Sequence, residues 1–225
     1  MTTDPLKEIL SNAEAVLFDF DGPICSVFDG YPAQQIADEL RELAHKIRGK
    51  SVSALDRVSS PHELLLAAAS DPELAQRLEA ALQEAELAAV RTALPTPGAA
   101  ESIAACNASG RVVAIVSNNY GQAVTDYLAR IGLAEQVAYI VGRNATDPTL
   151  MKPSPHLIEK AIQALNLESS DCVFVGDQTT DIEAGRAAGV PTIGYANKPG
   201  KVDALQSVGA DVVLTGMLEL AEAIH

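Results

Sequence analysis

Short apolar runs recur along this chain, and amphipathic helical patterns lie between them. The runs are AVLFDF at 15–20, RVVAIV at 111–116, VAYIV at 137–141, CVFVG at 172–176, VPTIGY at 190–195 and DVVL at 211–214. Runs of this length are typical of strands that are buried on both faces. Between the second and third runs, Val124, Tyr127 and Leu128 recur with the spacing of one helix face. This alternation predicts an α/β fold, in which helices cover both faces of a Rossmann-like parallel sheet.

Capping patterns mark the ends of several predicted helices. Asn119 and Gln122 fit the capping box at the start of the helix that follows the second run. Thr180 and Glu183 fit the same pattern after the fourth run. Gly132 fits the glycine that commonly follows the last turn of a helix. The patterns predict helices that begin shortly after the strands end.

Residues 26–95 interrupt this alternation. Their apolar residues recur only with helical spacing, at Ile36, Leu40, Leu43 and Ile47, and then at Leu74, Leu78, Ala81 and Leu82. We therefore predict a small all-helical domain at 26–95, inserted into a core formed by 1–25 and 96–225. Its hinges are expected near Cys25–Ser26 and Pro95–Pro97, where the chain leaves and re-enters the core.

Charge and composition limit the possible partners. The formal net charge is −14, so long-range repulsion argues against binding to nucleic acid. Three widely spaced cysteines form no Cys-x-x-Cys pair, which is typical of reduced thiols in a cytoplasmic protein. We see no secretion signal, and no apolar run approaches the roughly 20 residues of a membrane-spanning helix. We expect a cytoplasmic protein that binds neither membranes nor nucleic acid.

The first motif that suggests chemistry is Asp19-Phe20-Asp21-Gly22, at the end of the first predicted strand. Because side chains alternate along a strand, Asp19 and Asp21 point to the same side. The carboxyl ends of parallel strands border the ligand crevice in sheets of this kind. Two carboxylates there can bind a hard cation, or act as nucleophile and general acid. A turn capped by an Asp before Gly22 is the alternative.

A second acidic motif, Gly176–Asp181, directly follows the predicted strand CVFV. Asp177 precedes a helix and Asp181 lies in its first turn, so both can face the crevice that contains Asp19. Acids concentrated in this way are favourable around a divalent cation and repulsive otherwise. Acids that complement the dipole at a helix N-terminus are the simpler alternative.

Two further motifs carry groups that suit a phosphate. Ser117 and Asn118 follow the second strand, where a hydroxyl and backbone N–H groups at a helix N-terminus can hold phosphate oxygens. Lys152, before Pro153, supplies an ammonium that can contact a carboxylate and a phosphate oxygen together. The simpler alternative for Ser117 and Asn118 is an ordinary strand-to-helix turn. The simpler alternative for Lys152 is a surface charge.

In this order and spacing, DFDG, SN, KP and GDQTTD resemble the four motifs of the haloacid dehalogenase superfamily. The resemblance covers essentially the whole chain. Within the superfamily, the chain resembles the phosphatase branch of the phosphoglycolate phosphatase and β-phosphoglucomutase type. Members of that branch carry a mobile helical cap after the first motif. The insertion at 26–95 stands where that cap stands.

The resemblance implies a magnesium-dependent phosphatase that acts on a small phosphorylated metabolite. Asp19 would attack phosphorus to give an aspartyl-phosphate, and Asp21 would protonate the leaving oxygen and then activate water. The implied ligands of Mg²⁺ are the Asp19 carboxylate, the Asp21 backbone carbonyl and Asp177, with Asp181 in support. The residues implied to bind the transferring phosphoryl group are Ser117, Asn118 and Lys152.

Pro23 departs from the family pattern, which usually has a small hydroxylated or β-branched residue after the glycine of the first motif. Proline removes a backbone N–H and any hydroxyl. This departure bears on how Asp21 is oriented and how it is coupled to the cap.

The motifs leave three alternatives to a phosphatase. A dehalogenase would attack carbon without a metal, and such members generally lack the second acid, so Asp21 and Asp177 argue against it. A phosphomutase of the β-phosphoglucomutase type shares all four motifs and stays open. A regulatory protein that keeps the fold without turnover is the non-enzyme alternative.

The predicted cap contains a basic stretch in an otherwise acidic chain, formed by Arg41, Lys46, Arg48, Lys50 and Arg57. We expect at least one of these side chains to reach the site and recognise a second anionic or hydroxylated group of the substrate. The four histidines, His45, His62, His156 and His225, show no metal-ligand spacing and are expected on the surface or in the cap.

Overall fold

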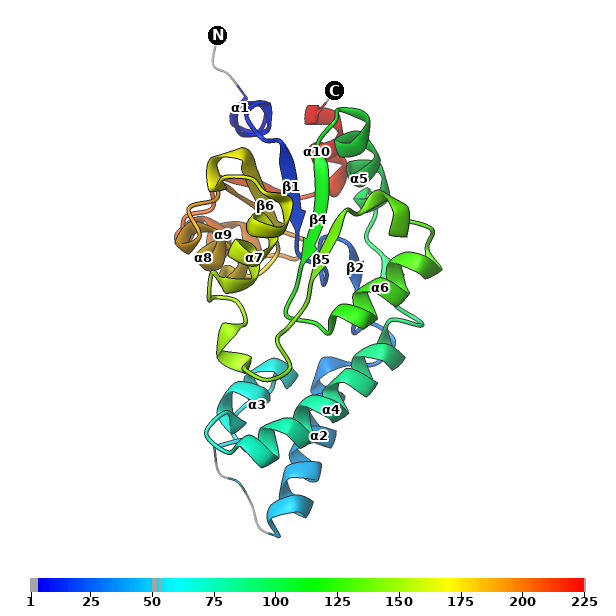
Figure 1. The fold of residues 1–225 in the computed structure, drawn as a ribbon, viewed down its shortest axis with the longest axis vertical. Helices are drawn as coiled ribbons and strands as arrows, with labels where there is room; N and C mark the ends of the chain where they lie inside the picture. Colours follow the sequence, from blue (N-terminus) through cyan, green and yellow to red (C-terminus); the bar gives the residue numbers. More distant parts are fainter. Residues whose placement is uncertain (1–3, 50–51, 53, 225) are drawn as a thin grey trace.

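The structure, a computed structural model, describes residues 4–49, 52 and 54–224. Its centre is a six-stranded parallel sheet in the order β5-β4-β1-β6-β7-β8 (Figure 1). The strands are β1 Ala15–Phe18, β4 Val112–Val116, β5 Tyr139–Val141, β6 Cys172–Gly176, β7 Thr192–Tyr195 and β8 Val212–Leu214. Each of the six apolar runs in the sequence contains one of these strands.

Helices cover both faces of the sheet. They are α1 Pro5–Ser11, α5 Ala99–Ala108, α6 Gly121–Arg130, α7 His156–Leu165, α8 Thr179–Ala187, α9 Lys201–Ser207 and α10 Met217–Ile224. Alternate residues of β1 point to opposite faces, as the two-residue period of a strand requires. Val16 and Phe18 pack with α5, α6 and α10, whereas Ala15 and Leu17 pack with α7 and α8. The predicted parallel sheet with helices on both faces is confirmed.

Three helices form a second packing unit, which we call the α2–α4 unit: α2 Ala33–Arg48, α3 Pro61–Ala68 and α4 Pro72–Ala89. Leu40, Leu65 and Leu78 belong to its own hydrophobic cluster, which also includes Met151 from the sheet part of the molecule. A short antiparallel ribbon connects the two parts, with β2 at Cys25–Ser26 paired to β3 at Leu94–Pro95. In Figure 1 the unit lies below the sheet.

The start of α6 differs from the sequence prediction. The N-cap residue of this helix is Tyr120 and its side chain makes no capping hydrogen bond, so the capping box predicted at Asn119 is wrong. The Asn119 side chain is instead held by Ser117 and by Glu86 of α4. Gly132 follows the end of α6 with a φ of 75°, which confirms the predicted helix-terminal glycine.

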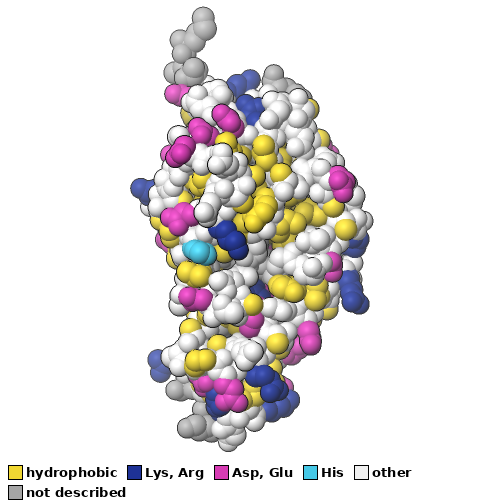
Figure 2. All heavy atoms as spheres, in the orientation of Figure 1, with side chains coloured by type: hydrophobic (Ala, Val, Ile, Leu, Met, Phe, Trp, Pro, Cys, Tyr) yellow, Lys and Arg dark blue, Asp and Glu magenta, His cyan; other side chains and the backbone are white. Residues whose placement is uncertain are grey.

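None of the helices in the described part of the chain is long and apolar enough to cross a membrane. Cys25, Cys106 and Cys172 are free and buried. On the face drawn in Figure 2, acidic and basic side chains are scattered, and no continuous basic patch forms there.

Candidate active site

Neighbouring strands β4, β1 and β6 end at the same edge of the sheet. In the parallel register, Phe18 of β1 lies between Ile115 of β4 and Val175 of β6. The chain continues from that edge into Asp19 after β1 and into Asp177 after β6. The register therefore brings together two acids that are far apart in the sequence.

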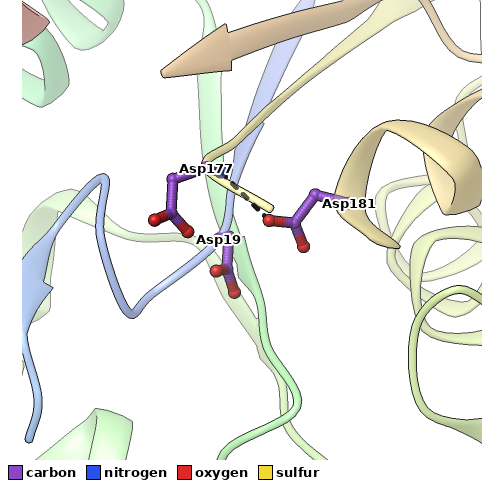
Figure 3. Close-up of side chains that lie close together, drawn as sticks. All are labelled: Asp19, Asp177 and Asp181. Atoms are coloured by element: carbon purple, nitrogen blue, oxygen red, sulfur yellow. Dashed lines mark hydrogen bonds between the residues drawn. The ribbon is translucent and has the colours of Figure 1, made fainter. Parts of the chain in front are cut away.

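Three buried aspartates meet at this edge (Figure 3). Asp19, Asp177 and Asp181 each offer a carboxylate oxygen, and these oxygens all lie within 4.8 Å of one another. Asp181 comes from the first turn of α8, whereas the other two directly follow strands. The structure thus gathers three of the four acids singled out in the sequence.

The start of α8 fixes the orientation of Asp181. Its Oδ2 accepts hydrogen bonds from the backbone N–H groups of Asp177, at 3.0 Å, and Gln178, at 2.9 Å. Gln178 and Asp181 form the capping box of α8, so the box predicted at Thr180 and Glu183 is wrong. The helix begins earlier because Asp181 accepts the hydrogen bonds that Glu183 was expected to accept.

The glycines of the two acidic motifs make room for the acids. A Cβ atom on Gly22 would lie 2.4 Å from Cγ of Asp177, and Gly22 also has a φ of 112°, which side chains disfavour. A Cβ atom on Gly176 would lie 2.3 Å from Cβ of Asp181. The absence of a side chain at Gly22 of the first motif therefore leaves room for the carboxylate of Asp177 of the second motif.

Two ammonium groups contact the acids. Nζ of Lys152 lies 2.7 Å from Oδ1 of Asp19 and 2.7 Å from Oδ1 of Asp181. Lys201, at the start of α9, forms an ion pair with Asp177. Lys152 is buried, and burial lowers its pKa, but the two carboxylates outweigh burial and raise the pKa above its usual value. Lys152 is therefore a permanent positive charge within the cluster.

The two ammonium groups do not fully offset the burial and mutual repulsion of the clustered carboxylates. Burial raises the pKa of Asp19 well above its usual range, and Lys152 opposes this rise only in part. Burial, and then the neighbouring Asp181, raise the pKa of Asp177. Raised values mean that the clustered carboxylates are poorly solvated and repel one another, so an additional cation would be favourable.

The donor set suits a divalent cation. Oδ1 of Asp177 is buried and has no hydrogen-bond partner among the described residues. Oxygen ligands from carboxylates are the ones that Mg²⁺ prefers in proteins. Asp19, Asp177 and Asp181 therefore fit such an ion.

Asp21 lies outside this cluster, on the wall of the same pocket. Its Oδ1 accepts a hydrogen bond from the backbone N–H of Val27 at 2.9 Å. Burial raises the pKa of Asp21 to about 6, although the Val27 hydrogen bond opposes the rise. A carboxyl group with this pKa can exist in both protonation states near neutral pH.

The turn around Pro23 is held by hydrogen bonds of its neighbour Gly22. The N–H of Gly22 donates to the Cys25 carbonyl at 2.7 Å, and Oγ1 of Thr96 donates to the Gly22 carbonyl at 2.6 Å. These contacts hold the loop that carries Asp21 onto the β2–β3 ribbon.

Ser117 and Asn118, which follow β4 at the sheet edge, also line the pocket. Oγ of Ser117 donates to Oδ1 of Asn119 at 3.0 Å. The Asn118 side chain accepts from the backbone N–H of Lys152 at 2.8 Å and donates to its carbonyl at 3.2 Å. Asn118 therefore fixes the backbone of Lys152, a role the sequence did not reveal.

The pocket lies between the sheet edge and the α2–α4 unit and has a volume of about 620 Å³. None of the described basic residues Arg41, Lys46, Arg48 and Arg57 lines it, and Lys50 lies outside the described residues. Arg41 donates to backbone carbonyls of Leu55 and Val58, and Arg48 pairs with Asp71. The expectation that a described member of this stretch reaches the pocket is wrong, because these two guanidinium groups are used inside the α2–α4 unit.

A buried ion-pair network joins the α2–α4 unit to the sheet part. Arg143 lies in the loop after β5. It donates two hydrogen bonds to the carboxylate of Glu79 and two to the carboxylate of Glu86, both on α4, at 2.8–3.0 Å. Glu86 also accepts from the Asn119 side chain and from the backbone N–H of Tyr120. The network therefore fixes the loop that carries Ser117 and Asn118 against α4.

Sequence reasoning missed several of these residues. Glu79 and Glu86 lie seven residues apart, on the helix face that also carries Leu82, and acids on an apolar face are a usable signal. His62 lines the pocket, although the spacing of the histidines gave no reason to single it out. No pattern in the sequence singled out Lys201, because only the fold brings the start of α9 close to Asp177.

Comparison with known proteins agrees with this arrangement. Residues 13–189 match the family described as haloacid dehalogenase-like hydrolase. A phosphoglycolate phosphatase of Xylella fastidiosa is 30% identical over 84% of this chain and 83% of its own. An N-acetylmuramic acid 6-phosphate phosphatase of Pseudomonas putida is 29% identical over 93% of this chain and 95% of its own.

A crystal structure of a predicted phosphatase from Clostridium acetobutylicum has the same fold. Its TM-score is 0.73 at 20% identity, with 94% of this chain and 98% of that chain covered. Fold and matches together define a hydrolase with a parallel sheet, helices on both faces and its acids at the strand ends. The chain belongs to the haloacid dehalogenase-like hydrolases. Within this family it is a phosphoric monoester hydrolase.

Proposed function

We propose that the protein is a Mg²⁺-dependent phosphatase that hydrolyses a small phosphate monoester through an aspartyl-phosphate on Asp19. The observation that carries the proposal is the contact of Asp19 with Lys152, within a cluster of three buried carboxylates. Phosphoryl transfer needs positioning and charge neutralisation more than any other contribution from the protein. The cluster supplies a carboxylate nucleophile and a fixed positive charge at one point.

Two steps use the chain's own residues. A carboxylate oxygen of Asp19 forms a bond to phosphorus while the ester oxygen leaves, and Asp21 gives that oxygen a proton. In the second step Asp21 takes a proton from water, the water oxygen bonds to phosphorus, and the Asp19 carboxylate leaves as inorganic phosphate is formed. A pKa of about 6 for Asp21 suits both the acid and the base role.

Asp19, Asp177 and the backbone carbonyl of Asp21, with Asp181 in support, would hold the Mg²⁺. The ion would supply Lewis-acid stabilisation of negative charge on the phosphoryl oxygens. Lys152 and Ser117 would bind the same oxygens, and Asn118 would hold the backbone of Lys152. The three residues together restrict how the phosphoryl group can be oriented.

We also propose that 26–95 forms a cap domain on a catalytic core of 1–25 and 96–225. Support comes from the pocket, which has one wall from the sheet edge and one from the α2–α4 unit. The β2–β3 ribbon carries both connections between the parts, which suits a hinge. A closed cap would exclude water and limit substrates to small metabolites. The three free, buried thiols support a cytoplasmic location.

Release of phosphate from p-nitrophenyl phosphate tests the proposal. We expect turnover with added Mg²⁺, loss of turnover in EDTA, and recovery when Mg²⁺ is restored. Full activity in EDTA would contradict the metal assignment. A sugar phosphate that is isomerised rather than hydrolysed would favour the phosphomutase alternative.

A further inference from the structure

Lys201 lies at the end of its helix that is unfavourable for a cation. It is the first residue of α9 and directly follows Gly200, the N-cap residue. The N-terminus of a helix carries a partial positive charge, so its own helix repels the Lys201 ammonium. The ion pair with Asp177 offsets this repulsion, and the Lys201 side chain is only 19% exposed. The position of Lys201 is therefore determined by the acid cluster rather than by α9.

The two carboxylate oxygens of Asp177 have different surroundings. Oδ2 accepts hydrogen bonds from three side chains, namely those of Lys201, Gln178 at 3.1 Å and Asn197 at 3.3 Å. Oδ1 is buried and has no hydrogen-bond partner among the described residues. Oδ1 is therefore the oxygen available to a metal ion. Without Lys201, Oδ2 would still have two neutral donors.

The charges of the cluster give Lys201 a role distinct from that of Lys152. Lys152 contacts Asp19 and Asp181 and lines the pocket, where a phosphoryl group can reach it. Lys201 contacts Asp177 and is not among the residues that line the pocket. Its charge therefore acts on the acid cluster and not on the substrate. A divalent ion held by the same acids would be repelled by the Lys201 ammonium.

We propose that Lys201 is a built-in counter-cation of the metal site, which compensates the charge of Asp177 when no metal ion is bound and weakens the binding of Mg²⁺. This inference rests on the proposed Mg²⁺ site and adds a residue that sets its affinity. Gln178 and Asn197 continue to hold Oδ2 when the Lys201 charge is removed, so Asp177 keeps its orientation. Loss of the charge then mainly removes the repulsion of the ion.

Binding of Mn²⁺, a paramagnetic substitute for Mg²⁺ that prefers the same oxygen ligands, tests the inference. The EPR signal of free Mn²⁺ measures binding without any turnover, and competition against Mn²⁺ measures Mg²⁺. We expect Lys201→Met to bind both ions about tenfold more tightly than the parent, a modest effect because Lys201 is partly exposed and its charge is partly screened. Unchanged binding would overturn the inference. Weaker binding would also overturn it, because Lys201 would then hold Asp177 in place for the ion.

Further variants separate the charge of Lys201 from its hydrogen bond. Lys201→Gln keeps an N–H donor without the charge, and it should bind the ions more tightly than the parent, as Lys201→Met does. Lys201→Arg keeps the charge and should bind them like the parent. Lys160→Met is the matched control, because it removes one exposed lysine of α7 and should also leave binding unchanged. Equally tight binding in Lys201→Arg or Lys160→Met would contradict a role for the Lys201 charge.

Thermal unfolding provides a second readout that does not depend on turnover. Without added metal, Lys201→Met should be less stable than the parent, because Asp177 loses its ion pair. A ligand adds more stability to the protein that binds it more tightly, so Mg²⁺ should narrow the difference between the two proteins. A difference that stayed the same with and without Mg²⁺ would show that Lys201 acts on the fold alone, and it would overturn the inference.

Failure of this inference can be distinguished from failure of the proposed function. Binding of Mn²⁺ to the parent tests the metal site itself, and no binding would contradict the proposed Mg²⁺ dependence. Binding to the parent that Lys201→Met leaves unchanged would keep the metal site and overturn only the role of Lys201.

Discussion

Nζ of Lys152 lies 2.7 Å from Oδ1 of Asp19, although 133 residues separate them in the sequence. The same ammonium contacts Asp181 and the carbonyl of Val116. It therefore links three strand-end segments and faces the carboxylate that we propose as nucleophile.

Removal of the Lys152 charge should stop catalysis. In Lys152→Met the phosphoryl group loses a fixed cation, and we expect turnover to fall by about 10²–10³-fold, the cost of one lost transition-state donor. Steady-state phosphate release measures the effect. Lys160→Met, at an exposed position of α7, is the control and should keep full turnover. Turnover of Lys152→Met within tenfold of the parent would contradict the role of Lys152.

Gly22→Ala should disable the site by displacing Asp177. The added Cβ would lie 2.4 Å from Cγ of Asp177, so either the loop or the acid must move. We expect turnover to fall at least tenfold and the Mg²⁺ concentration needed for half-maximal turnover to rise. Gly110→Ala is the matched control, because Gly110 also has a positive φ, 82°, but nothing lies within 4 Å of the added atom. That variant should lose about 1 kcal/mol of stability and keep its activity.

Asp21→Asn should slow the second step more than the first for p-nitrophenyl phosphate. Nitrophenolate leaves without a proton, whereas attack by water still needs a base. We expect a burst of nitrophenol equal to the enzyme concentration, followed by slow turnover, in a stopped-flow assay. Steady turnover at the parent rate without a burst would exclude Asp21 as the base.

Glu86→Gln should destabilise the protein in a manner that depends on pH. The pKa of Glu86 is lowered from 4.5 to about 2, so its stabilisation is present above pH 4.5 and is lost as the pH falls toward 2. We expect the variant to lose about 3 kcal/mol near neutral pH, because Arg143 loses one of its buried partners. Urea unfolding of both proteins at pH values from 7 downward measures the difference, which should shrink below pH 4.5.

The control for this prediction is Glu84→Gln, at an exposed position of the same helix. It should match the parent at every pH. A loss in Glu86→Gln that stayed constant down to acid pH would mean that the charge of Glu86 is not what stabilises the network.

The sequence predicts the sheet and the acid cluster because both follow from local patterns. The six apolar runs contain the six strands, and Asp19 and Asp177 follow two of them directly. Parallel register then brings the two acids to one edge. The helix starts were less predictable, since the cap of α8 depends on Asp181 accepting two backbone hydrogen bonds.

Contacts between the sheet part and the α2–α4 unit could not be predicted from the sequence. Arg143 meets Glu79 and Glu86 across about sixty residues of chain, and nothing local at Arg143 indicates it. Arg41 and Arg48 were expected to reach the pocket. Arg41 instead donates to a backbone carbonyl, and Arg48 forms an ion pair with an acid, both within the α2–α4 unit. Charge alone does not show where a long side chain points.

Binding of beryllofluoride tests the central claim, that the Asp19 carboxylate accepts the phosphoryl group. Beryllofluoride coordinates a carboxylate oxygen and mimics an aspartyl-phosphate. We expect bound fluorine resonances in the ¹⁹F NMR spectrum of the parent protein with Mg²⁺. We expect none in Asp19→Asn, which is nearly isosteric but lacks the charged oxygen, provided that its far-UV circular dichroism matches the parent. The same bound resonances in Asp19→Asn, or none in a parent protein that hydrolyses p-nitrophenyl phosphate, would contradict the claim.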